Sequence, residues 1–132
     1  MADKKKILLV DDDEMFRLAL QHYLQEAGYE VVTAQGQQEA DGILENYKPD
    51  LAIVDLFMEE HDSGFVLSYH IKKIDPAIPV IMVTALGSEM HVQFDTATNE
   101  ERSWIKADIL MDKPVRFEQV RREIDRFLQP KE

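Results

Sequence analysis

Four short apolar stretches of this 132-residue chain are each followed by side chains that could take part in chemistry. Asp11-Asp12-Asp13 come after the first stretch, Asp55 after the second, Thr84 after the third, and Lys113 closely after the fourth. A charged residue at one such position is commonly only the first solvated residue of a loop. Acids, a hydroxyl and a lysine at four corresponding positions indicate a shared site instead.

These residue types point to magnesium-assisted phosphoryl chemistry. Clustered carboxylates repel one another unless a hard cation neutralises them, and oxygen ligands of this kind suit Mg²⁺, which keeps several of its waters. A carboxylate beside the metal, a lysine and a threonine can attack a phosphoryl group, because the cations neutralise its oxygens and the hydroxyl donates to another. The expected product is an aspartyl phosphate.

The elements that must position these residues alternate along the chain. Apolar runs without the alternation of a half-exposed strand predict buried strands at Ile7–Val10, Leu51–Val54, Val80–Val83 and Ile109–Met111, and a β-branched run predicts another at Tyr29–Thr33. Helical periodicity predicts helices over about Glu14–Ala27, Ala40–Tyr47, Val66–Ile74 and Phe117–Leu128. Strand and helix in alternation predict an α/β fold with a parallel sheet, whose ligands gather at the carboxyl ends of the strands.

Two helix ends and one irregular segment have local signals. Asp13 is expected to be the N-cap of the first helix, and Gly28 its left-handed stop. Between residues 86 and 108 the helical pattern breaks, but Thr98-Asn99-Glu100-Glu101 has the form of a capping box. A short helix is therefore predicted from there to about Lys106.

Composition narrows the class of protein. The length predicts one domain over residues 1–132, with a structured core at about 5–129. The chain has no cysteine, so a reduced, cytoplasmic location is expected, and no apolar run is long enough for a signal peptide or a membrane span. A formal charge of -11 argues against direct binding of nucleic acid.

Four short motifs connect the chain with a known family. They are Val10-Asp11-Asp12, Val54-Asp55-Leu56, Val83-Thr84-Ala85 and Asp112-Lys113-Pro114. In order and spacing they closely resemble the signatures of bacterial response regulator receiver domains, over essentially the whole chain. The resemblance implies a five-stranded parallel sheet in the flavodoxin-like order 2-1-3-4-5, with helices on both faces. It also implies two-component signal transduction, with a sensor histidine kinase or phosphotransfer protein upstream and an output partner or domain downstream.

The resemblance also implies a role for each site residue. By position, Asp55 resembles the phosphoacceptor and a metal ligand, and Thr84 and Lys113 resemble the pair that senses the phosphoryl group. Asp12 resembles a direct ligand of Mg²⁺ and Asp11 one that acts largely through water, with the backbone carbonyl of Phe57 completing the protein ligands. The domain is expected to be a signalling domain that assists its own phosphorylation, and not an enzyme in the usual sense.

The chain departs from the family pattern at three places. The loop Met58–Gly64 lacks the usual proline and is one residue longer than the common Asp-Gly turn, and the stretch between Thr84 and Lys113 is several residues longer than is typical. Leu110 stands where many receivers have a switching aromatic residue. Activation is nevertheless expected to act on the face formed by the helix after Thr84, the strand at Ile109–Met111 and the last helix, which could form a homodimer.

Two apolar positions bear on how long the phosphoryl group lasts. Phe57 and Leu86 lie two residues beyond Asp55 and Thr84, where fast-hydrolysing receivers often carry polar side chains. Neither can orient a water by hydrogen bonding, and in-line attack requires an oriented water. Slow autodephosphorylation is therefore expected.

Other functions would use parts of the same pattern. A haloacid-dehalogenase-type phosphatase shares the apolar strand followed by Asp-x-Asp, but this interpretation leaves Asp55 unused and lacks an acidic motif after Lys113. A flavodoxin-like cofactor binder would need a hydroxyl-rich or glycine-rich loop where this chain has three acids. A phosphorylation-independent interaction module is the remaining alternative.

Overall fold

The computed structural model describes residues 4–56, 58, 63–84 and 107–128. The strands are β1 (Lys6–Val10), β2 (Glu30–Ala34), β3 (Leu51–Asp55), β4 (Val80–Thr84) and β5 (Ile109–Asp112). The helices are α1 (Glu14–Glu26), α2 (Gln37–Leu44), α3 (Ser63–Ile74) and α6 (Phe117–Leu128). None of the described helices is both long enough and apolar enough to cross a membrane.

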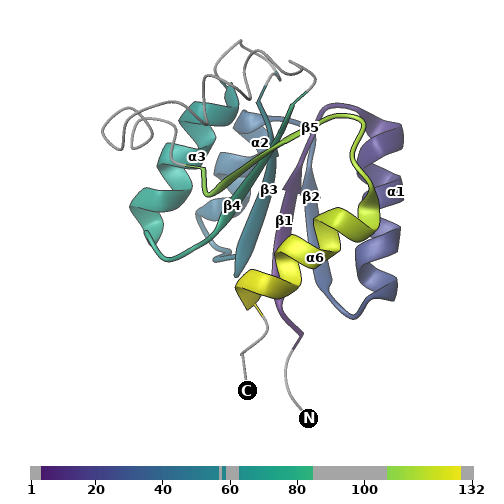
Figure 1. Ribbon diagram of the computed structural model, residues 1–132. Helices are drawn as coiled ribbons and strands as arrows, with labels where there is room; N and C mark the ends of the chain where they lie inside the picture. Colours follow the sequence, from purple (N-terminus) through teal and green to yellow (C-terminus); the bar gives the residue numbers. More distant parts are fainter. Residues whose placement is uncertain (1–3, 57, 59–62, 85–106, 129–132) are drawn as a thin grey trace, which may run out of the picture.

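The strands form one parallel sheet in the order β2-β1-β3-β4-β5, which confirms the predicted topology (Figure 1). β1 pairs with β2 on one side and with β3 on the other, so that Leu8 lies between Val32 and Ala52. The chain winds in one direction from β1 to β2 and in the other from β3 to β5. The carboxyl ends of β1 and β3 therefore meet at the point where ligands gather in sheets of this kind.

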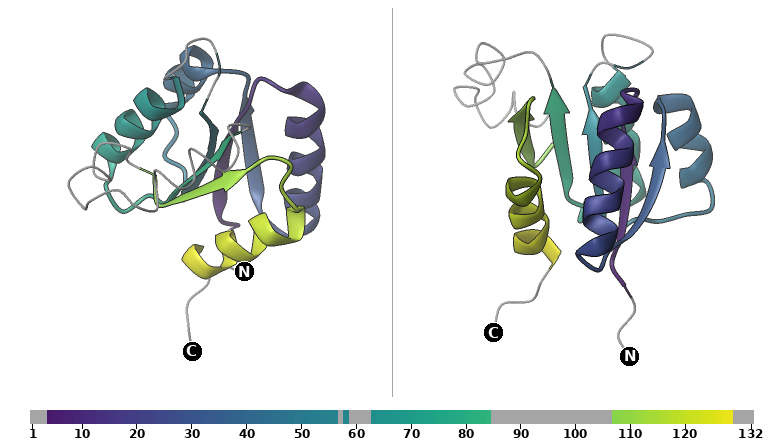
Figure 2. Two further views of the ribbon diagram at one scale, coloured as in Figure 1. Left: turned by 45° about the horizontal axis from the view of Figure 1, so that its top comes forward. Right: turned by 90° about the vertical axis from the view of Figure 1, so that its right-hand side faces the viewer.

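Helices cover both faces of the sheet (Figures 1 and 2). Because successive strand residues point to opposite faces, Ile7 and Leu9 join a core cluster with residues of α1 and α6, whereas Leu8 and Val10 join a cluster with residues of α2 and α3. All four side chains are fully buried. Burial of each such side chain stabilises the fold by about 1.5–3 kcal/mol. Because helices cover both faces of the sheet, strand residues that point to either face are apolar, and this explains the unbroken apolar runs in the sequence.

The ends of α1 follow the predicted signals. The Asp13 side chain caps the helix by accepting from the backbone N–H of Phe16 at 3.2 Å. Gly28, which follows the helix, has a φ of 102°, in the left-handed region that glycine adopts without strain. α2 begins earlier than predicted and ends at Leu44, so Tyr47 lies beyond it. The expected helix from Thr98 to Lys106 lies outside the described residues.

A glycine allows α3 to begin directly against the end of β3. The backbone N–H of Gly64 donates to the carbonyl of Leu56 at 2.9 Å. A Cβ atom at this position would lie 2.5 Å from both the carbonyl oxygen of Asp55 and the Cα atom of Leu56. Real Cβ atoms do not approach that closely, so only glycine fits this contact between helix and strand.

A lysine joins the elements at the opposite end of the sheet. The Lys72 ammonium donates to the carbonyl of Ile78 at 2.6 Å and to the carboxylate of Asp108 at 2.7 Å. That carboxylate also accepts from the backbone N–H of Val80 at 2.8 Å. These contacts connect the end of α3, the start of β4 and the start of β5.

Candidate functional site

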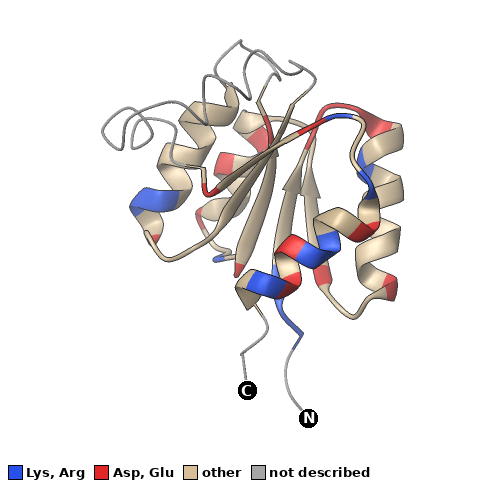
Figure 3. Ribbon diagram, in the orientation of Figure 1, with Lys and Arg blue, Asp and Glu red and all other residues tan. Residues whose placement is uncertain are grey.

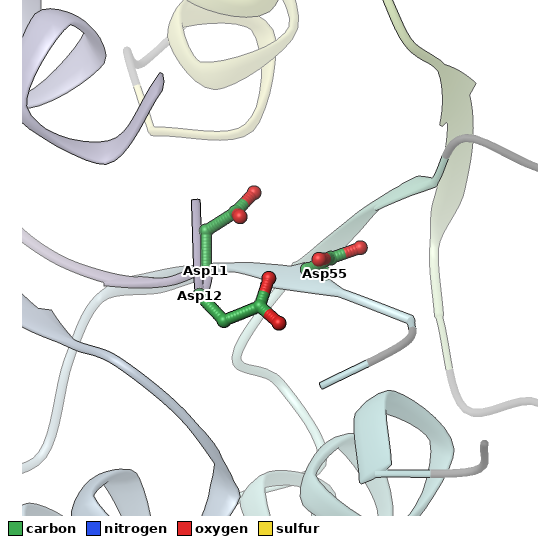
Figure 4. A group of neighbouring side chains, drawn as sticks. All are labelled: Asp11, Asp12 and Asp55. Carbon is green, nitrogen blue, oxygen red and sulfur yellow. The ribbon is translucent and has the colours of Figure 1, made fainter. Parts of the chain in front are cut away.

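Three carboxylates come together at the carboxyl ends of β1 and β3 (Figure 4). Asp11, Asp12 and Asp55 each place an oxygen within 4.8 Å of the others. Asp11 and Asp55 are buried, with 1% and 7% of their surface exposed, whereas Asp12 is exposed. The register of the central strands produces this convergence, because Val10 of β1 lies beside Val54 of β3 and the acids follow directly.

The carboxylate of Asp11 is held by contacts on both oxygens. Its Oδ1 atom accepts from the backbone N–H of Asp13 at 2.9 Å, and its Oδ2 atom lies 2.9 Å from the Lys113 ammonium. Both oxygens of Asp11 therefore already have partners, whereas Asp12 is open to solvent.

Lys113 reaches the acids from the end of β5, the edge strand of the sheet. Thr84 lies beside Asp112 in the pairing of β4 with β5, and the backbone N–H of Lys113 donates to the Thr84 carbonyl at 2.8 Å. The Lys113 ammonium then lies 2.9 Å from Asp11 and 3.8 Å from Asp55. It thus offsets part of the repulsion between the two buried carboxylates. The Lys113–Pro114 peptide bond is cis.

Of the residues predicted for the site, the structure brings Asp11, Asp12, Asp55 and Lys113 together, and Thr84 ends β4, the strand that pairs with β5 just before Lys113. Thr84 is fully buried. Figure 3 shows the acidic residues in the segment that joins β1 to α1. The Phe57 carbonyl and the Leu86 side chain lie outside the described residues.

Two residues of α1 contact the site although the sequence did not predict it. Arg17 is buried, and its Nη1 atom donates to the backbone carbonyl of Asp11 at 2.8 Å. Phe16 lies under Lys113, whose ammonium is 4.6 Å from the centre of the ring. The available signal was their place in the first turn after the acids, where a side chain can fold back over the strand end.

The donor set fits a hard cation. It consists of oxygens alone, two of the three carboxylates are buried, and they lie close enough for one ion to contact them all. The group could therefore hold a metal ion. No thiolate ligand is available, since the chain has no cysteine.

Comparison with known proteins identifies the class to which this fold and acidic site belong. Residues 7–125 match the response regulator receiver domain family, and the chain belongs to that family. A haloacid-dehalogenase-type phosphatase is not favoured by this match. The sequence is 36% identical over 110 residues to the alkaline phosphatase synthesis transcriptional regulatory protein PhoP of Bacillus subtilis, covering 83% of this chain and 42% of PhoP. It is 42% identical over 85 residues to the probable transcriptional regulator ycf27 of Cyanophora paradoxa, covering 64% of this chain and 35% of that protein.

Solved receiver structures share the fold over almost the whole chain. The response regulator TrrA of Thermotoga maritima, crystallised in complex with Mg²⁺ and BeF, is 31% identical with a TM-score of 0.76, covering 94% of this chain and 99% of TrrA. A CheY-like receiver domain from Methanospirillum hungatei is 28% identical with a TM-score of 0.76, covering 94% of this chain and 93% of that domain. The chain is thus as long as these receivers, but it spans only about two fifths or less of the curated relatives named above.

Proposed function

We propose that this receiver domain accepts a phosphoryl group on Asp55 and uses the phosphorylated state to signal to an output partner. The observation that supports this choice is the position of the Asp55 carboxylate. It is buried at the end of a central strand, within 4.8 Å of the other two acids and 3.8 Å from the Lys113 ammonium. Asp11 and Asp12 follow β1 instead. Asp55 is the member of this acidic group that lies at the end of β3, the middle strand of the sheet.

In the proposed reaction an oxygen of Asp55 attacks the phosphorus of the donor. A new O–P bond forms while the bond to the leaving group breaks, and the leaving group keeps the electron pair of that bond. Lys113 neutralises one phosphoryl oxygen, and the Thr84 hydroxyl donates a hydrogen bond to another. Positioning by three neighbouring strand ends accounts for the assistance that the domain gives to its own phosphorylation.

We assign the cation to Mg²⁺, with Asp12 and Asp55 as direct ligands, Asp11 acting through water, and the Phe57 carbonyl completing the protein ligands. When bound, Mg²⁺ would supply positive charge to the phosphoryl oxygens. The all-oxygen donor set supports this choice, and TrrA, a structural relative, was crystallised with Mg²⁺ and BeF. Asp11 keeps its contacts to Lys113 and to the Asp13 backbone, which makes it an organiser of the site.

The partners follow from the family. We expect a sensor histidine kinase or phosphotransfer protein as the physiological donor. Two of the relatives are named transcriptional regulators and are more than twice as long as the stretch that they share with this chain, so an output domain or partner is expected beyond it. A homodimer through β5, α6 and the helix expected after Thr84, the absence of direct nucleic-acid binding, and slow autodephosphorylation remain predictions.

Incubation with acetyl phosphate and Mg²⁺, followed by intact-mass measurement, tests the proposal. The protein should gain one phosphoryl group that hydroxylamine removes, and EDTA should prevent the gain. Asp55→Asn should abolish it, whereas Asp75→Asn, which changes an acid at the end of α3 away from the site, should not. Stoichiometric, hydroxylamine-sensitive labelling of the Asp55→Asn protein would overturn the assignment. A phosphorylation-independent module would show no gain in any of the proteins.

A further inference from the structure

The Lys113 ammonium has an aromatic neighbour besides its carboxylates. Its Nζ atom lies 4.6 Å from the centre of the Phe16 ring, while Asp11 is at 2.9 Å and Asp55 at 3.8 Å. Only 18% of the Lys113 side chain is exposed. The ammonium is thus bounded by acids and by the face of a ring, and the ring occupies space that water would otherwise fill.

Both the backbone and the packing of α1 hold Phe16 in this place. Its N–H donates to the capping carboxylate of Asp13, and the next residue, Arg17, donates to the Asp11 carbonyl at 2.8 Å. The ring also meets Phe117 edge-on, with centroids 6.0 Å apart and planes at 72°. The Phe16 ring therefore keeps a defined position relative to the acids.

A ring face is suited to restraining a lysine. The four-carbon stem of lysine has about 2 kcal/mol of rotamer entropy, so an ammonium without lateral contacts samples many positions. A cation within about 6 Å of a ring centroid is attracted by the negative face of the ring, and the attraction is stronger where water is partly excluded. The ring restrains the ammonium without competing for its hydrogen bonds, which stay directed at oxygens.

We propose that Phe16 is a positioning residue for Lys113, whose ammonium its π face holds at the acidic site ready for the phosphoryl oxygens. This inference rests on the proposed function of Lys113. In this proposal Phe16 acts through the lysine and not on the reacting atoms themselves. The opposing interpretation is that Phe16 only fills the core between α1 and α6, where size and not electron density would matter.

Nuclear magnetic resonance of the metal-free protein tests the contact itself. The ring current of Phe16 should move the Lys113 ε-methylene resonances upfield. Phe16→Leu should abolish this displacement and Phe16→Tyr should retain it. Unchanged Lys113 resonances in Phe16→Leu would overturn the proposal, whether or not the protein accepts a phosphoryl group.

Phosphorylation kinetics test the function of the contact. With acetyl phosphate and Mg²⁺, Phe16→Leu should react about two- to fivefold more slowly, as expected for an attraction of this kind, and Phe16→Tyr should react at close to the wild-type rate. Replacement of Phe16 by mono-, di- and trifluorophenylalanine, which keep nearly the same shape but weaken the negative face, should slow the reaction in steps. Equal rates across the fluorinated series would overturn the proposal.

A second cation–ring pair in the same molecule provides the matched control. The Arg126 guanidinium lies 5.4 Å from the centre of the Phe127 ring at the far end of α6. Phe127→Leu removes the same ring type from a cation that the site does not use, and the rate should not change. If the wild-type protein is not labelled at all, the proposed function fails, and the resonance measurement still decides the contact between Phe16 and Lys113.

Discussion

At the scale of single residues, the buried acids of the site differ in what holds them. Asp11 is tied to a backbone N–H and to the Lys113 ammonium, both at 2.9 Å. Asp55 lies farther from the ammonium, at 3.8 Å, so less of the repulsion from the other two carboxylates of the site is offset there. Removal of the charge should therefore have opposite effects at the two positions.

We expect Asp55→Asn to raise the free energy of unfolding by about 1 kcal/mol in EDTA, because it relieves repulsion between carboxylates. Asp11→Asn should lower it by about 1–2 kcal/mol, because a charge-assisted bond to Lys113 is lost. Urea unfolding of both variants against wild type gives the two signs. A loss of stability in Asp55→Asn equal to that in Asp11→Asn would contradict this account. Addition of Mg²⁺ should then stabilise the wild-type protein more than Asp55→Asn.

Tyr47 should make the stability of the fold sensitive to alkaline pH. Burial, followed by the nearby charges of Glu30 and Asp50, raises the pKa of its hydroxyl from 10.0 to about 12. Because the folded state favours the neutral phenol, this contribution is complete below pH 10 and is lost as the pH rises towards 12.

The comparison of Tyr47→Phe with wild type isolates this contribution. The variant should lose less stability than wild type between pH 10 and 12, as measured by urea unfolding at each pH. Tyr69→Phe, which changes a half-exposed tyrosine of α3, is the control for loss of a surface phenol. Parallel pH profiles for Tyr47→Phe and wild type would refute the prediction.

At the scale of elements, the contact between α3 and β3 depends on Gly64. A Cβ atom there would lie 2.5 Å from the Asp55 carbonyl oxygen, so Gly64→Ala must displace the start of α3 or the end of β3. We expect a loss of about 1–3 kcal/mol, typical of overpacking, together with slower phosphorylation of Asp55. Gly42→Ala is the matched control, because nothing lies within 4 Å of its Cβ position in α2. That substitution should instead stabilise the fold by about 0.4–1 kcal/mol.

Strands, layers and most of the acidic site could be predicted from the sequence, because each depends on local pattern. Unbroken apolar runs identified β1, β3 and β4, whose apolar residues are buried on both faces. The strand ends then placed Asp11 and Asp55 together.

The roles of Phe16 and Arg17 could not be predicted in this way. The helical pattern of apolar residues assigns Phe16 to the core. That Lys113, which follows β5, lies over its ring is visible only in the folded structure. Arg17 would be expected in solvent by residue type, and the carbonyl that it binds is visible only once α1 is folded against β1. The end of α2 was also predicted too late in the chain, because Tyr47 continued the apolar pattern of the helix past Leu44.

At the scale of the whole molecule, one end of the sheet carries the site and the other end contributes to stability. The carboxyl ends of the strands carry the acids, and the opposite end is joined by Lys72 through Ile78 and Asp108. Lys72→Met should lower the free energy of unfolding by about 1.5–3 kcal/mol, because a hydrogen bond to a charged group is lost. Its rate of phosphorylation by acetyl phosphate should equal that of wild type. A double-mutant cycle with Asp108→Ala measures the coupling, and additive effects would show that the contact contributes nothing.

The described helices divide the core between two pairs, α1 with α6 and α2 with α3, and this has a consequence for synthesis on the ribosome. α2 and α3 precede β4 in the chain, so the face that they cover can close early. The face that carries Ile53 and Ile81 needs Val120 and Ile124 of α6, the last described helix. A nascent chain that has reached only β4 therefore leaves part of this apolar sheet face uncovered, a state in which chaperones bind and chains aggregate. We therefore expect folding of this receiver to be completed only after α6 has left the exit tunnel.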